Sequence, residues 1–91
     1  MNVNKRKRRT PEEARTLLLD TAEARLAELG LEGLNVAGVA KAAGMSHATL
    51  LHHFGSSIGM RKALVERMSE RFINDALAAF DNQGDVDAVV R

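Results

Sequence analysis

The chain has 91 residues, no cysteine and a formal net charge of +1. This length suits one small domain, and a chain without cysteine can form neither a disulfide nor a thiolate metal site. It lacks the roughly 18 consecutive apolar residues of a membrane span and the apolar core of a signal peptide. We therefore expect a cytoplasmic protein with no membrane partner.

The charges are distributed unevenly along the chain. Residues 1–10 form a basic arm, which we expect to be disordered and which carries five consecutive cations: Lys5, Arg6, Lys7, Arg8 and Arg9. Residues 33–65 contain no Asp or Glu but hold all three histidines. A polyanion would therefore be attracted to these two stretches and to no other part of the chain.

The first predicted helix spans Pro11–Leu29. Thr10 stands at the N-cap, proline follows at the first helical position, and Glu13 completes a capping box. Helical spacing predicts that one face of this helix is buried, through Leu18, Ala22, Leu26 and Leu29. Leu31 is expected to fold back onto the helix after a glycine cap.

A short second helix is predicted after the N-cap Asn35. Its buried stripe has the spacing i, i+3, i+4 and i+7, through Val36, Val39, Ala40 and Ala43. The opposite face carries only Ala37, Gly38 and Lys41. This nearly bare face can approach another surface closely.

A third helix is predicted at about His47–Phe54, after a sharp turn at Gly44. Ser46 is its N-cap, and Leu50 and Phe54 form its buried side. Two short helices joined by a glycine turn are typical of the helix-turn-helix.

A long fourth helix is predicted from the cap at Ser56 to about Phe80. Its first half carries an apolar residue every four positions, at Met60, Leu64, Met68 and Phe72. Three short helices cannot cover its whole length, so the second half is predicted to meet a partner through Ile73, Leu77 and Phe80. Residues 81–91 are expected to begin a further helix.

Residues 11–80 resemble the DNA-binding domain of TetR-family transcriptional repressors. The most specific parts are "VAGVAKAAGMS", Thr49-Leu50 and "HHF". The resemblance implies an all-α fold, a TetR-like or homeodomain-like three-helix bundle with a long fourth helix. It places the helix-turn-helix domain at residues 11–56, a connecting helix at 57–80, and the start of a truncated ligand-binding and dimerisation domain at 81–91.

The resemblance also implies partners and contacts. The partners are double-stranded DNA, a second copy in the full-length protein, and a small-molecule effector bound by the domain that this chain lacks; no cofactor is implied. Base contacts are implied for His47, Ala48 and Thr49, and phosphate or sugar contacts for Asn35, Leu51, His52, His53 and Ser57. Leu51 stands where the family usually has tyrosine, Ser57 where it often has lysine, and Ala37 and Gly38 where it often has a long polar residue. Each departure removes a side chain that could reach DNA.

Other functions for these side chains find little support. Metal ligands on one helix usually lie at i and i+4, whereas His47 and His52 are five residues apart. His53 lies near the edge of the buried face, so it is either a structural residue or a phosphate contact. No base-and-nucleophile arrangement or pair of carboxylates supports an enzyme.

The leading hypothesis is therefore a sequence-specific duplex-DNA-binding transcriptional regulator, a repressor, with its third helix in the major groove. The alternative is a helical protein-interaction or dimerisation module that uses the apolar stripe of the fourth helix. The two hypotheses can be distinguished by the position of residues 33–65, which contain no Asp or Glu, relative to that apolar stripe.

Overall fold

The computed structural model describes residues 9–83. The described chain is all-α, with the order α1 (Pro11–Leu29), the short 3-10 helix η2 (Gly30–Leu34), α2 (Val36–Ala42), α3 (His47–Phe54) and α4 (Ser57–Gln83). The predicted all-α fold is confirmed. None of the helices described in this range is both long and apolar enough to cross a membrane.

The start of α1 forms as predicted. The backbone N–H of Glu13 donates to Thr10 Oγ1 at 3.0 Å, and the Thr10 N–H donates to Glu13 Oε1 at 2.9 Å. This reciprocal capping box satisfies two of the N–H groups that a helix leaves free at its first turn. Gly30, with a φ of 75°, ends the helix.

The path of the chain after the end of α1 differs from the prediction. Leu29 and Leu31 were expected to pack inward, but they are 52% and 70% exposed. The reason is the 3-10 helix η2, which turns more tightly than an α-helix. It leaves these two side chains in solvent and buries Leu34 instead. Gly33 permits this path, because a Cβ there would lie 2.6 Å from the backbone oxygen of Arg25.

The core lies where α1, α2, α3 and the first half of α4 meet. Its largest fully buried side chains come from all four helices: Leu18, Val39, Leu50, Met60 and Leu64. Leu19 is also buried, although the predicted stripe of α1 omitted it. The predicted series on α4 holds through Met68, which packs against the core, and is wrong for Phe72, which is 73% exposed.

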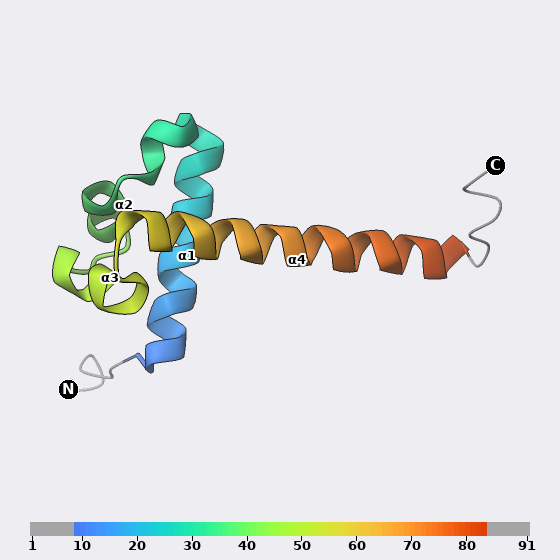
Figure 1. The fold of residues 1–91 in the computed structure, drawn as a ribbon, viewed down its shortest axis with the longest axis horizontal. Coiled ribbons are helices and arrows are strands. Elements are labelled where there is room, and N and C mark those ends of the chain that lie inside the picture. Colours follow the sequence, from blue (N-terminus) through green and yellow to red (C-terminus); the bar gives the residue numbers. More distant parts are fainter. Residues whose placement is uncertain (1–8, 84–91) are drawn as a thin grey trace, which may run out of the picture.

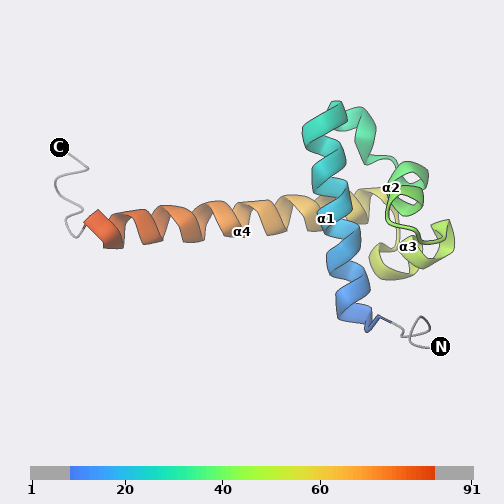
Figure 2. The ribbon, with the colours of Figure 1, turned by 180° about the vertical axis from the view of Figure 1, so that it is seen from behind.

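Phe72 is exposed because α4 extends past the bundle. Figure 1 shows α4 crossing α1 and projecting away from the other helices, and Figure 2 shows the same arrangement from behind. The helix continues to Gln83, three residues beyond the predicted end at Phe80, so residues 81–83 belong to α4. The remainder of the predicted further helix lies outside the described residues.

Ion pairs link α1 and α4 where the two helices cross. Arg67 pairs with Asp20 and lies 3.4 Å from Glu23 Oε1, and Arg71 pairs with Glu23. The paired residues are almost fifty positions apart in the sequence. The ion pairs therefore add a directional connection to the apolar contact between these helices.

Candidate nucleic-acid interface

The turn between α2 and α3 is held by backbone hydrogen bonds. Gly44, with a φ of 74°, donates its N–H to the Lys41 oxygen at 3.0 Å, and Met45 donates to the Ala40 oxygen at 2.9 Å. The Met45 side chain also packs against the core. The direction in which α3 leaves the bundle is therefore fixed.

The cap of α3 also orients one of the predicted base contacts. Ser46 Oγ accepts from the Thr49 N–H at 2.9 Å and donates to Thr49 Oγ1 at 2.8 Å. A hydroxyl has one donor and two acceptor sites, so the Thr49 hydroxyl keeps hydrogen-bonding capacity beyond its bond with Ser46. The predicted cap is confirmed.

The two sides of α3 are clearly different. Leu50 is fully buried, and Phe54 packs against the core while Arg15 of α1 lies over its ring, 5.1 Å from the centroid. His47 and Ala48 are exposed. The start of α3 therefore presents one polar ring and one methyl group to solvent.

The second half of α3 is partly covered. Leu51, predicted to touch a sugar, is half-buried and packs against the core, which leaves less of it available to a ligand. His52 is exposed, whereas His53 is half-buried beside Phe54, with its ring centroid 6.3 Å from that of Phe54. Within residues 9–83 there is no group of three His, Cys, Asp or Glu placed to hold a metal ion.

Asn35 lies at the exposed start of α2. Its Oδ1 accepts from the Gly38 N–H at 2.6 Å and its Nδ2 donates to the Glu32 oxygen at 3.0 Å. Capping uses one amide hydrogen and the amide oxygen. The second amide hydrogen is left for a phosphate.

The start of α4 carries polar and basic side chains. Ser56 Oγ accepts from the Gly59 N–H at 2.9 Å, as expected of a cap, and Ser57 is half-buried in the first turn. Arg61 and Lys62 follow and are exposed. Like α2 and α3, this first turn has no acidic residue.

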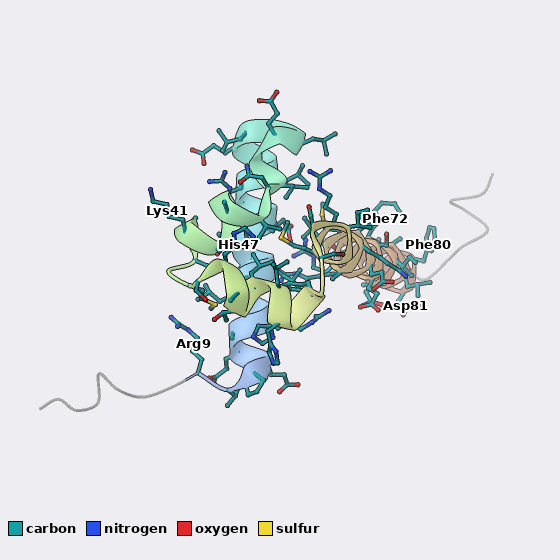
Figure 3. The ribbon with its side chains drawn as sticks, turned by 60° about the vertical axis from the view of Figure 1, so that its left-hand side comes forward. Arg9, Lys41, His47, Phe72, Phe80 and Asp81 are labelled. Carbon is teal, nitrogen blue, oxygen red and sulfur yellow. The ribbon has the colours of Figure 1, made fainter. Side chains whose placement is uncertain are left out.

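The basic residues near α2 and α3 lie on a different side of the molecule from the apolar residues in the second half of α4. Figure 3 shows Arg9, Lys41 and His47 on one side, and Phe72, Phe80 and Asp81 on the other. Of the five cations of the basic arm, Lys5, Arg6, Lys7 and Arg8 lie outside the described residues. The surface around α2 and α3 is therefore separate from the apolar stripe of α4.

Residues 18–64, about half of the chain, match the family model described as "Bacterial regulatory proteins, tetR family". The chain belongs to the TetR family. The chain is also similar to the HTH-type transcriptional regulatory protein RaaS of Mycobacterium tuberculosis, with 38% identity over 66 residues. That alignment covers 65% of this chain and 31% of RaaS, so the chain spans about a third of its relative's length. No solved structure matches the chain.

One basic residue beside this TetR-family helix-turn-helix was not among the predicted site residues. Arg25 of α1 donates its Nε–H to the Gly33 oxygen at 2.7 Å, and its guanidinium lies against Gly38 of α2. An isolated glycine inside a short helix often marks a close approach. That signal was present in the sequence, but the sequence could not show which residue approaches.

Proposed function

We propose that this TetR-family chain is a sequence-specific duplex-DNA-binding transcriptional regulator that acts as a repressor. The observation that carries the proposal is α3, a capped helix without acidic residues, anchored by Leu50 and exposed at its start. A helix fits the major groove, and the N-terminal residues of a recognition helix contact base edges. We propose that this role is binding rather than catalysis and that the protein acts in the cytoplasm, where the chromosome lies.

The start of α3 carries the proposed base contacts. His47 offers a ring N–H, Thr49 offers a hydroxyl that keeps hydrogen-bonding capacity beyond its bond with Ser46, and Ala48 offers a methyl group. Hydroxyls can donate to base acceptors, and apolar groups pack against the thymine methyl. We propose that these three side chains read the sequence.

The proposed phosphate and sugar contacts come from the second half of α3, from the starts of α2 and α4, and from the basic arm. They comprise the free amide hydrogen of Asn35, the side chains of Leu51, His52 and His53, the first turn of α4 at Ser57, and the basic arm. Each neutralised phosphate changes the slope of log affinity against log salt by about −0.9. The five cations of the arm would contribute about −4.5, and they would raise affinity more than specificity.

The test compares the chain's affinity for duplex DNA upstream of its own gene with its affinity for a scrambled duplex, at two salt concentrations. We expect tighter binding to the natural sequence, lost on His47→Ala or Thr49→Ala. Ser69→Ala, on exposed α4, is the control for removing a hydroxyl and should bind as wild type does. Equal affinity for the two duplexes would contradict sequence-specific reading.

A second surface supports a proposed partner. The projecting half of α4 exposes Phe72, Ile73 and Leu77, and Phe80 extends the same stripe. Apolar side chains gathered on one face mark interaction sites. We propose that Ile73, Leu77 and Phe80 contribute to a homodimer in the full-length protein, whose two recognition helices would enter successive major grooves about 34 Å apart.

Leu77→Asp tests the homodimer. It places a charge in the stripe and should shift the full-length protein toward monomer in sedimentation, and weaken binding to a two-half-site duplex more than to a single half-site. Glu70→Asp, on the exposed surface of the same helix, is the control. An unchanged sedimentation coefficient would argue against this stripe as the dimer contact.

A further inference from the structure

Gly38 leaves a space on the outward face of α2, and a side chain of α1 fills this space. Gly38 lies beside Lys41 on the side of α2 opposite its buried residues, Val36, Val39 and Ala40. A Cβ on Gly38 would lie 2.8 Å from Arg25 Cζ, and it would also meet Arg25 Nη2. The Arg25 guanidinium therefore occupies the position that a side chain at residue 38 would take.

Arg25 is held in place at its Nε. This atom donates to the Gly33 oxygen at 2.7 Å, and the buried Gly33 brings the backbone of η2 close to α1. A guanidinium has five N–H donors in a fixed planar fork, and this bond uses one of them. The other four lie on the two terminal nitrogens, of which Nη2 lies beside Gly38 of α2.

Arg25 forms no ion pair with a carboxylate in the described part of the chain. Within residues 9–83, the ion pairs join Arg67 and Arg71 to Asp20 and Glu23, on the side of α1 that faces α4. A partly covered cation keeps a stronger field than one surrounded by water, because salt screens it less. Arg25 is therefore a preoriented positive charge with donors to spare.

This charge lies next to the proposed DNA-binding surface. Residues three positions apart on a helix are neighbours, so the guanidinium over Gly38 lies one turn from Lys41. Lys41 is on the same side of the molecule as His47 and Arg9 (Figure 3). The Cβ position that meets the guanidinium is also 2.8 Å from Asn35 Oδ1, so the free Asn35 amide hydrogen is close by.

We propose that Arg25 binds a backbone phosphate of the DNA, through the gap left by Gly38. The inference rests on the proposed function and adds a contact from α1 to it. A guanidinium fork matches two phosphate oxygens, and such charge-assisted bonds are among the stronger ones in proteins. The absence of a long side chain at residue 38 then removes no phosphate contact, because Arg25 supplies it from another helix.

The experiment measures affinity over a series of salt concentrations for Arg25→Gln, on the natural and the scrambled duplex. Removing one phosphate contact should lower the steepness of the log–log salt plot by about 0.9. Affinity should fall about tenfold at low salt on both duplexes, with their ratio unchanged, because phosphates carry no sequence. Arg71→Gln, an equal change of charge on α4, should leave the salt slope as in wild type.

Arg25 also bonds to Gly33, so thermal unfolding is measured on the same variants. A purely structural Arg25 would lower the melting temperature and leave the salt slope of the folded protein unchanged, and that result overturns the proposal. Gly38→Ala keeps Arg25 but displaces its guanidinium, in a helix that alanine favours. A Cβ there would also lie 2.8 Å from Asn35 Oδ1 of the α2 cap, so the thermal unfolding of this variant is measured as well. Gly38→Ala should weaken binding to both duplexes, and wild-type affinity would likewise overturn the proposal.

The two proposals fail in different ways. A wild-type chain that binds both duplexes equally contradicts sequence reading, yet the salt slopes of Arg25→Gln and Arg71→Gln still decide whether Arg25 binds phosphate. A chain that discriminates between duplexes, but whose slope does not change in Arg25→Gln, retains the proposed function and loses the Arg25 contact. A chain that binds no duplex overturns both.

Discussion

Truncating one buried and one exposed apolar side chain tests the division of the molecule into a packed bundle and a projecting helix. Leu50 anchors α3 and is 0% exposed. Replacing a fully buried leucine by alanine costs about 2–5 kcal/mol, since it removes apolar contacts and leaves a cavity. At about 0.05–0.15 kcal/mol per residue, the 75 described residues supply roughly 4–11 kcal/mol. Leu50→Ala should therefore remove a large share of the free energy of unfolding.

Phe72→Ala should cost much less. A buried aromatic side chain covers roughly 200 Å², and with 73% of Phe72 exposed about 50 Å² is removed from water. At about 25 cal/mol per Å², the loss is at most about 1.3 kcal/mol. Although Phe72 is larger than Leu50, its truncation should be the milder of the two.

Urea unfolding followed by circular dichroism, at two protein concentrations, measures both losses. We expect Leu50→Ala to lower the midpoint strongly and Phe72→Ala slightly. A loss above 3 kcal/mol for Phe72→Ala, with a midpoint independent of concentration, would refute the projecting α4. A midpoint that rises with concentration would instead show that a second copy covers Phe72.

Substitutions at three further positions test local features. Ser46→Ala should lower the free energy of unfolding by about 1 kcal/mol, because it removes the cap of α3. Ser46→Asp should keep that stability but weaken DNA binding, because it adds a negative charge. Urea unfolding and DNA titration of both variants check these expectations. Glu23→Gln should destabilise by about 1 kcal/mol or less, with the difference shrinking in high salt as the pairing with Arg71 and Arg67 is screened; unfolding with and without added salt measures this. Gly55→Ala should cost about 1–3 kcal/mol, because Gly55 has a φ of 81°; an unchanged unfolding midpoint would contradict that strain.

The helix starts could be predicted because a cap is a local interaction. Thr10, Asn35 and Ser46 each accept a hydrogen bond from the backbone N–H three residues later, as their sequence context indicated. Each bond depends only on residue type and on the turn that follows. The predicted bounds of α1 and α3 are confirmed for the same reason.

The depth of burial along a helix could not be predicted from spacing. Helical periodicity shows which side of α4 is apolar, but it does not show how far along α4 the neighbouring helices extend. Met68 and Phe72 are one turn apart on the same face, and only Met68 meets the core. The same limit explains Leu29 and Leu31, whose burial depended on the unpredicted 3-10 turn at η2.

The charge of a surface also differs from the charge of the segment that builds it. Most of α1 lies between Glu12 and Glu32, where acidic residues gather, so by sequence alone it should repel a polyanion. In the fold, Asp20 and Glu23 face α4, where Arg67 and Arg71 pair with them, whereas Arg25 reaches α2. Packing thus pairs two acidic residues of this helix with α4 and directs one of its cations toward α2. The surface built by the acid-free residues 33–65 therefore gains the positive charge of Arg25, which lies outside those residues in the sequence. Gly38 has no side chain that could reach DNA, and the space beside it is occupied by the Arg25 guanidinium.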